Sequence, residues 1–276
     1  MPLVAMTREM GSLGKDVAAQ LSQRLGKRVV HHEIIGMLAD KMRLRKSHVV
    51  RFLEGKAGIW ERMTTDSTSL AIFTADETLR LVEDGQVAVL RGWGAVHLLR
   101  SVPHVVRVRV CAPFETRVER MMQRLNTEDR GFVESEIRLS EEAHAAITRR
   151  HFGLEWTQPE HYDLVLNTER VPIDRCVDEI ANFFAEPRFQ ETPDSVRMFA
   201  DLALQTHVRA ALRTDPRTSK MNILVAASEG RITLSGVIEP GLEERDAVDV
   251  AQSVRGVSEV ESALRVTAAS RYKMDS

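Results

Sequence analysis

The first part of the chain alternates short apolar runs with longer segments in which apolar residues recur every three or four positions. A continuous apolar run is typical of a strand buried on both faces, and the three-to-four spacing is typical of an amphipathic helix. The predicted strands are 3–6, 28–30, 87–90, 105–110 and 164–166, and the predicted helices are 17–25, 33–42, 70–82, 114–125, 135–152 and 173–184. Alternating strands and helices predict an α/β fold with a parallel sheet flanked by helices.

The pattern changes after residues 187–194, which contain two prolines and no periodicity. We interpret this segment as a linker. Beyond it the pattern predicts helices at 195–213 and 242–253 and strands at 222–227, 231–235 and 263–266. The first two of these strands are joined by Glu229-Gly230, and a two-residue turn between strands predicts a hairpin. We therefore expect a first domain at 1–186, a linker at 187–194, a small α+β domain at 195–268 and a tail at 269–276.

Composition argues against several classes of protein. The formal net charge is −2, which argues against a strongly basic nucleic-acid-binding protein. The two cysteines are far apart and form no CxxC pair, so neither a zinc site nor a disulfide framework is expected. No apolar run is long enough to span a membrane, and the amino terminus shows no secretion signal. We expect a cytoplasmic protein without a transmembrane segment.

A glycine-containing turn, residues 9–16, follows the first predicted strand and precedes a helix. This order directs backbone N–H groups at an anion. A complete phosphate-binding loop reads GxxxxGK[ST], in which Gly14 and Lys15 fit, whereas Glu9 replaces the first glycine. Asp16 replaces the hydroxyl residue that would contact Mg²⁺, so it either coordinates the ion directly or repels phosphate. A glycine-rich helix start without a ligand is the structural alternative.

Four segments, in order, resemble the cytidylate kinase-like family. They are VAMTREMGSLGKDVA at 4–18, HEII at 32–35, VLRGWGA at 89–95 and PEHYDLVLNT at 159–168. The last is the most specific, and together they span nearly all of residues 1–185. The resemblance implies a P-loop kinase fold that uses ATP and Mg²⁺. It also implies phosphoryl transfer to CMP, dCMP or a related small acceptor.

The resemblance also assigns the donor site. The residues that it places around the ATP phosphates are Gly11, Ser12, Leu13, Gly14, Lys15 and Asp16. Among these, Lys15 would neutralise phosphate charge as a catalytic residue, and Asp16 would be the metal ligand.

For the acceptor, the resemblance points to Arg91 and Gly92, where the glycine replaces a carboxylate that accompanies this arginine in cytidylate kinases. Arg149 and Arg150 would stabilise the transferred phosphoryl group, because its transition state spreads negative charge over several oxygens. The segment 141–146 replaces part of the basic pattern of the related kinases. The alternatives are a surface role for Arg91 and an ordinary solvated helix face for Arg149 and Arg150.

The second domain resembles the BON family. The matching segments are 201–212, 223–225, GRITLSGV at 230–237, VRGVSEV at 254–260 and LRV at 264–266. The resemblance implies binding of phospholipid, another small ligand or a protein. Acidic and basic residues nearly balance in this region, whereas anionic lipid favours a polybasic surface. Protein contact or a soluble ligand therefore stays equally open.

Two other functions are compatible with the sequence. The first domain could be a catalytically weak or inactive nucleotide-binding sensor that signals through the BON-like domain, as Asp16 and the reduced basic pattern at 141–146 suggest. Alternatively, the first domain is only a scaffold and the function lies in the BON-like domain.

Overall fold

The computed structural model describes residues 3–30, 67–92 and 94–266. The chain divides into two compact units, Met1–Val196 and Arg197–Ser276. The helix expected at 33–42, the family segment at 32–35 and the tail at 269–276 lie outside the described residues. Among the described helices, none combines the length and the hydropathy that a membrane span requires.

The first unit contains a five-stranded sheet in the order β2-β3-β1-β4-β5, and all of its strand pairs are parallel. The strands are β1 Leu3–Arg8, β2 Arg28–Val30, β3 Val87–Arg91, β4 Val105–Cys111 and β5 Leu164–Asn167. The expected parallel sheet is confirmed. The central strand β1 lies between β3 and β4, with Met6 opposite Arg91 and Thr7 opposite Arg109.

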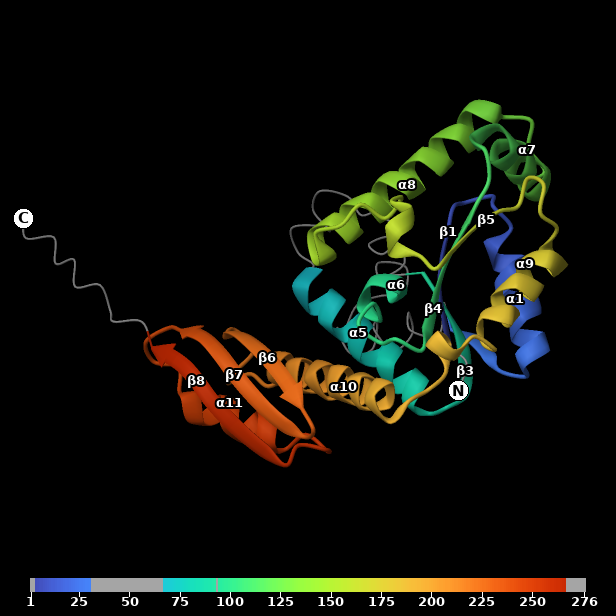
Figure 1. Cartoon of the computed structure of the whole chain (residues 1–276). Helices are drawn as coiled ribbons and strands as arrows, with labels where there is room; N and C mark the ends of the chain where they lie inside the picture. Colours follow the sequence, from blue (N-terminus) through green and yellow to red (C-terminus); the bar gives the residue numbers. More distant parts are fainter. Residues whose placement is uncertain (1–2, 31–66, 93, 267–276) are drawn as a thin grey trace, which may run out of the picture. The chain divides into compact units, whose positions relative to one another are not determined.

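Helices cover both faces of this sheet (Figure 1). They are α1 Gly14–Leu25, α5 Ser67–Glu83, α6 Ala95–Leu98, α7 Phe114–Leu125, α8 Arg130–Phe152 and α9 Ile173–Phe183, with the 3-10 turns η1 Pro159–His161 and η2 Pro187–Phe189. Figure 1 shows α1 and α9 on one face, and α5 and α6 on the other. Helix α8 begins before the predicted Ser135, because Asp129 caps it by accepting a hydrogen bond from the Phe132 N–H (2.9 Å).

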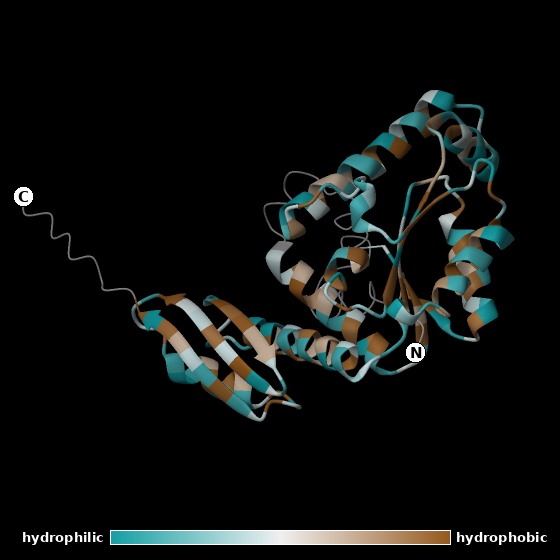
Figure 2. Ribbon diagram, viewed as in Figure 1, coloured by the Kyte–Doolittle hydropathy of each residue, from teal (hydrophilic) through white to brown (hydrophobic). Residues whose placement is uncertain are grey.

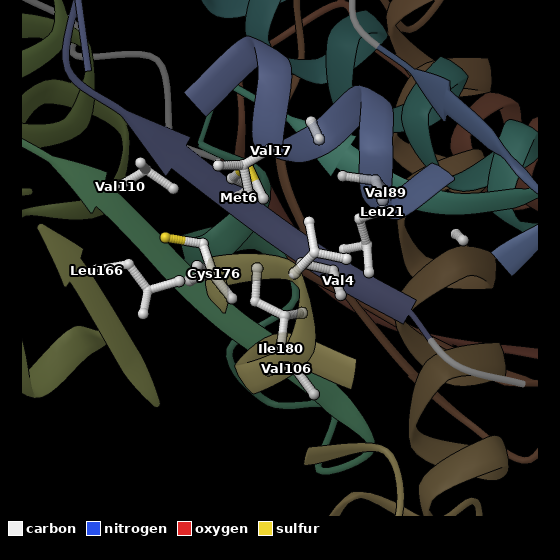
Figure 3. Packing of buried hydrophobic residues seen from close by; sticks show 14 residues of the cluster. Val4, Met6, Val17, Leu21, Val89, Val106, Val110, Leu166, Cys176 and Ile180 are labelled. Carbon is white, nitrogen blue, oxygen red and sulfur yellow. The ribbon is translucent and has the colours of Figure 1, made fainter. Parts of the chain in front are cut away.

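The main core lies between the sheet and the α1/α9 layer (Figure 3). Successive residues of a strand point to opposite faces, so Val4 and Met6 of β1 both contribute to this cluster. They meet Val17 and Leu21 of α1, and Ile180 of α9. In Figure 2 the strands of this sheet are mainly brown, the colour of hydrophobic residues, as expected for a sheet covered on both faces.

All five strands are parallel, so their carboxyl ends meet at one edge of the sheet. The loops after β1 and β3 leave the sheet there. Figure 1 shows α7 and α8 beyond this same edge. Ligands of open α/β sheets bind outside the carboxyl ends of the strands, where neighbouring connections diverge. This edge is therefore the expected place of a functional site.

The second unit contains a three-stranded sheet of order β6-β7-β8. Its elements are α10 Pro193–Thr214, β6 Asn222–Ser228, β7 Arg231–Ile238, α11 Glu244–Gln252 and β8 Glu259–Val266, of which α10 starts before the division of the units. Strands β6 and β7 are antiparallel and β8 is parallel to β7, which confirms the predicted hairpin at Glu229-Gly230. This unit has its own core, which includes Val208, Ile232 and Leu234.

Candidate functional site

The loop between β1 and α1 ends in an unusual backbone conformation. Leu13 precedes the helix in the left-handed region (φ 59°), and its carbonyl accepts the N–H groups of Asp16 (2.9 Å) and Val17 (3.0 Å). In the part of the chain that the structure describes, the N–H groups of Gly11, Leu13, Gly14 and Lys15 have no hydrogen-bond acceptor. Unpaired amides at the positive end of a helix form an anion-binding arrangement.

The carbonyl groups of the loop, in contrast, are occupied. The Glu9 carbonyl accepts hydrogen bonds from the backbone N–H (3.2 Å) and the hydroxyl (2.8 Å) of Ser12. The Met10 carbonyl accepts from Nη1 of Arg117 (3.4 Å), and the Ser12 carbonyl accepts from Oγ1 of Thr168 (2.7 Å). The C=O and N–H of a trans peptide point in opposite directions. Binding the carbonyls on one side therefore leaves the amides facing the other.

Glu9, which stands at the position of the first glycine of a complete loop, is buried (8% exposed). Its carboxylate accepts the Ala112 N–H (3.2 Å) and forms ion pairs with Arg109 (2.6 Å) and Arg117 (3.3 Å). These partners belong to β4, α7 and their connection. No N–H of the loop binds this carboxylate, so its charge is compensated away from the open amides. The predicted anion site is therefore not filled by its own acidic residue.

The side chains of Lys15 and Asp16 are both exposed at the start of α1, beside the open amides. The structure thus brings residues 11–16 together in one loop. Among the described residues there is no cluster of three or more His, Cys, Asp or Glu residues that could hold a metal ion. Mg²⁺ in nucleotide sites uses one or two carboxylates together with substrate phosphates, so a single carboxylate at this place suits Mg²⁺ delivered with a nucleotide.

Arg91 ends β3 and is buried (6% exposed), so it does not have the surface position that the structural alternative required. The N–H of Gly92 donates to the Met6 carbonyl (2.9 Å), which places this loop directly beside β1. Gly94 has φ 74°, and a Cβ there would lie 2.6 Å from the ring of Phe152. The carboxyl end of α8 therefore approaches the loop that carries Arg91 and Gly92.

Arg149 and Arg150 lie in the last turn of α8, and both are exposed. Nε and Nη2 of Arg149 contact Oε1 of Glu155 at 2.8 and 2.6 Å. Within the described residues neither arginine contacts Lys15 or Arg91. The predicted site residues thus separate into two groups. The loop and Arg91 lie at the sheet edge, and Arg149 and Arg150 lie on the surface of α8.

Two other arginines, which the sequence analysis did not single out, lie against the loop. Arg109 and Arg117 share the carboxylate of Glu9, and Nη2 of Arg117 also contacts Oε1 of Glu141 (2.7 Å). Glu141 opens the acidic segment that departs from the family's basic pattern. This network joins the loop to α7 and α8. The signal available in the sequence was the alternation of arginines along β4, with Arg107 and Arg109 pointing to the face opposite the main core.

A layer of histidines lies on the same face of the sheet as Arg109. His144 stacks on Trp156 (4.3 Å, 10°), and His97 contacts His161 edge-on (5.6 Å). Within the part of the chain that is described, Nε2 of each of these three histidines is buried without a hydrogen-bond partner. Burial, followed by the charges of neighbouring groups, lowers the pKa of His144 to about 3 and that of His97 to about 4. Both imidazoles are therefore neutral at pH 7.

The cytidylate kinase-like family matches residues 3–170, more than half of the chain. The chain belongs to the cytidylate kinase-like family. A BON domain matches residues 200–268 of this cytidylate kinase-like protein. The family resemblance expected from the sequence is confirmed for both parts of the chain.

A cytidylate kinase from Methanothermobacter thermautotrophicus is 28% identical over 111 residues, which cover 40% of this chain and 66% of that protein. The crystal structure of an uncharacterized protein from Eubacterium ventriosum has a TM-score of 0.52 at 17% identity, covering 67% of this chain and 99% of that one. A shikimate kinase from Acinetobacter baumannii, solved with shikimate, covers 69% and 96% at 14% identity, and its TM-score of 0.41 is too low to support an inference. The similarity to the Eubacterium protein concerns the fold alone.

The most specific family segment, 159–168, makes two sets of contacts in this cytidylate kinase-like domain. Asp163 holds Arg107 of β4 through its backbone N–H (2.8 Å) and its guanidinium group (2.7 Å). Thr168, five residues further on, donates its hydroxyl to the Ser12 carbonyl. The segment therefore attaches β5 to β4 and the end of β5 to the loop between β1 and α1.

Proposed function

We propose that the first domain transfers the γ-phosphoryl group of ATP to CMP, dCMP or a related small acceptor. The observation that carries this proposal is the row of open amides at Gly11, Leu13, Gly14 and Lys15, at the carboxyl edge of the parallel sheet. Membership of the cytidylate kinase-like family supports the reaction class. The distant relative named cytidylate kinase supports the choice of acceptor.

The roles follow from charge and position. The open amides hold the β- and γ-phosphates, and the ammonium group of Lys15 neutralises charge that accumulates there during transfer. Arg91, buried at the end of the neighbouring strand beside Gly92, orients the acceptor phosphate. The carboxylate of Asp16 is exposed at the same loop and would hold Mg²⁺, which supplies further neutralisation of phosphate charge when it is bound with ATP.

One observation favours a second candidate function, a catalytically weak or inactive nucleotide-binding sensor. Phosphoryl transfer needs cations around the transferred group. Arg149, which was expected to provide one, is exposed and forms two contacts with Glu155. Under this alternative the open amides bind nucleotide, but the transition state lacks its positive charge, and occupancy is signalled through the BON domain.

A coupled ATPase assay with CMP, dCMP, UMP and AMP, combined with calorimetric ATP binding, distinguishes the two functions. We expect turnover with a pyrimidine monophosphate. The Lys15→Ala variant should lower kcat/KM by about 100-fold, the loss typical of removing one charge-stabilising group. The matched control is Arg24→Ala, which removes a cation from the last turn of the same helix, where Arg24 forms an exposed pair with Asp178.

Each outcome of this assay has a defined meaning. ATP binding without turnover of any acceptor supports the sensor. Turnover that Lys15→Ala and Arg24→Ala reduce equally would contradict the role given to the loop. A wild-type protein that neither binds ATP at millimolar concentration nor turns over any acceptor would remove both functions, leaving the first domain as a scaffold for the BON domain.

We further propose that the BON domain binds a ligand or partner and takes no part in phosphoryl transfer. Its sheet and its core are built entirely from its own residues. Binding experiments with vesicles of anionic phospholipid and of neutral phospholipid test the first class of partner. Binding that requires anionic lipid would identify a membrane surface as the partner.

A further inference from the structure

The open amides of the loop belong to peptide groups whose carbonyls are held by side chains from distant parts of the chain. The peptide between Ser12 and Leu13 has its carbonyl bound by Thr168 and its N–H open. The peptide between Met10 and Gly11 has its carbonyl bound by Arg117 and its N–H open. In both cases the carbonyl is bound on one side of the peptide and the open N–H points to the other side.

We propose that Thr168 is a positioning residue for phosphate binding, which acts by fixing the orientation of the Leu13 N–H. Arg117 has the same role for the Gly11 N–H. This inference rests on the proposed function, since it concerns how the loop receives the phosphates of ATP.

The neighbours of the Thr168 hydroxyl determine that it donates its proton to a backbone carbonyl. Its Oγ1 accepts a hydrogen bond from Nη1 of Arg120 (3.0 Å), and Nη2 of Arg120 also donates to the Thr168 carbonyl (2.8 Å). The single hydroxyl proton is then left for a carbonyl acceptor. The Ser12 carbonyl is 2.7 Å away, whereas the next acceptor, the Cys111 carbonyl, is 3.4 Å away. Arg120 therefore fixes the hydroxyl as a donor toward the loop.

Thr168 is itself held firmly. Its backbone N–H donates to the Cys111 carbonyl (2.9 Å), and the residue is 5% exposed. Ser12, on the other side of the contact, is fully buried. Leaving a buried carbonyl without a donor is unfavourable, so without the hydroxyl the peptide gains from rotating until its carbonyl finds another donor or water. Such a rotation turns the Leu13 N–H away and points a carbonyl dipole toward the bound phosphate.

Arg117 is positioned by the acidic residues around it. Its Nε lies 3.3 Å from Oε2 of Glu9, and its Nη2 lies 2.7 Å from Oε1 of Glu141. Space is restricted as well, because a Cβ at Gly11 would lie 2.7 Å from the Arg117 carbonyl oxygen. The glutamate that breaks the glycine pattern of the loop is thus one of the groups that hold the arginine against it.

The test compares three variants of the full chain by calorimetry with ATP and with inorganic tripolyphosphate. Thr168→Val keeps the shape of the side chain and removes the hydroxyl, and Thr168→Ser keeps the hydroxyl. The matched control is Thr78→Val in α5, where a buried hydroxyl donates to the Thr74 carbonyl of its own helix (2.6 Å). Thermal unfolding of each variant is measured in parallel, so that binding is compared only where all proteins are folded.

We expect Thr168→Val to weaken the binding of both probes by about tenfold, the equivalent of one lost orienting hydrogen bond. Thr168→Ser should bind within about threefold of the wild type, and Thr78→Val should lower only the melting temperature. Unchanged tripolyphosphate affinity in Thr168→Val, with a wild type that binds, would overturn this inference and leave the proposed function intact. A wild type that binds neither probe would overturn both.

Discussion

Glu9 is the residue at which the loop departs most from a complete phosphate-binding motif. Its carboxylate is bound by two guanidinium groups and the Ala112 N–H, so the negative charge is compensated where it is buried. The Ser12 hydroxyl and N–H bind its carbonyl. A glycine at this position would leave Arg109 and Arg117 without their shared partner. We infer that Glu9 has a structural role in this loop, as the shared partner of the two arginines.

The buried His144 makes the stability of the first unit depend on pH. Its pKa is lowered to about 3 by burial and then by the neighbouring His97, Arg8 and Arg109. Between pH 6.5 and 3, His144 is therefore protonated in the unfolded chain and neutral in the native protein. The contribution of His144 to the free energy of unfolding is therefore fully present above pH 6.5 and is lost as the pH falls from 6.5 toward 3. The slope contributed by this histidine is at most about 1.4 kcal/mol per pH unit.

The His144→Phe variant, which keeps a ring against Trp156, removes this contribution. Urea unfolding between pH 4.5 and 8 checks it. We expect the difference in unfolding free energy between wild type and variant to be constant above pH 7 and to shift in favour of the variant below pH 6.5. A difference that does not change across the whole range would show that His144 titrates normally in the native protein.

Helix α8 is held to the rest of the domain by two different kinds of contact. Its amino-terminal half packs through Val133 and Ile137 against Val118 of α7, and Glu141 pairs with Arg117. Its carboxyl-terminal half lies on a polar layer, where the only close aromatic contacts involve His144 and Phe152 among the described residues. Buried polar atoms without partners stabilise a contact less than apolar packing does. We therefore expect the end of α8 that carries Arg149 to be its less stable half.

Glu141 of α8 is expected to stabilise the domain through its ion pair with Arg117. Glu141→Gln removes the charge that Arg117 faces from α8, and we expect it to lower the free energy of unfolding by about 1–2 kcal/mol, because Arg117 is buried. The control, Glu134→Gln, removes a charge from an exposed pair with Arg130 on the same helix and should cost less than about 0.5 kcal/mol. Chemical denaturation measures both, and equal losses would contradict the buried role of the Arg117–Glu141 pair.

The protein has two hydrophobic cores, which are formed by separate parts of the chain. The first gathers β1, β4, α1 and α9, and the second gathers α10, β7 and α11. Both cores contain fully buried aliphatic residues, for example Leu21 in the first and Leu234 in the second. Burial within each unit predicts that neither needs the other to fold.

A fragment of residues 193–276, which includes all of α10, tests this independence. We expect a single cooperative thermal transition by circular dichroism, because the fragment retains the complete cluster around Ile232. The variant Ile232→Asp, which places a charge in that cluster, should abolish the transition. A fragment that melts without cooperativity would mean that the first unit contributes to the stability of the second.

Much of the fold could be predicted from local patterns. Helix α7 was expected at 114–125 and is found at Phe114–Leu125, since its apolar spacing is regular and flanked by a proline and an asparagine. The single turn α6 was missed because four residues are too short to show a period. The early start of α8 was missed because its first turn depends on a cap at Asp129 and not on apolar residues. Local patterns could not predict which side chains from distant parts of the chain face the loop between β1 and α1.

By itself, the sequence determined the order of strands and helices, the glycine turn with Lys15, the hairpin at Glu229-Gly230 and the membership of the family. Those features depend on residues that are neighbours along the chain. Only the tertiary structure decided that Thr168 reaches Ser12, 156 positions away, and that Glu9 faces Arg109 and not the open amides of its own loop. The physical reason is the strand order, because β1 pairs with β4 and β4 pairs with β5, which brings the ends of distant strands to one edge.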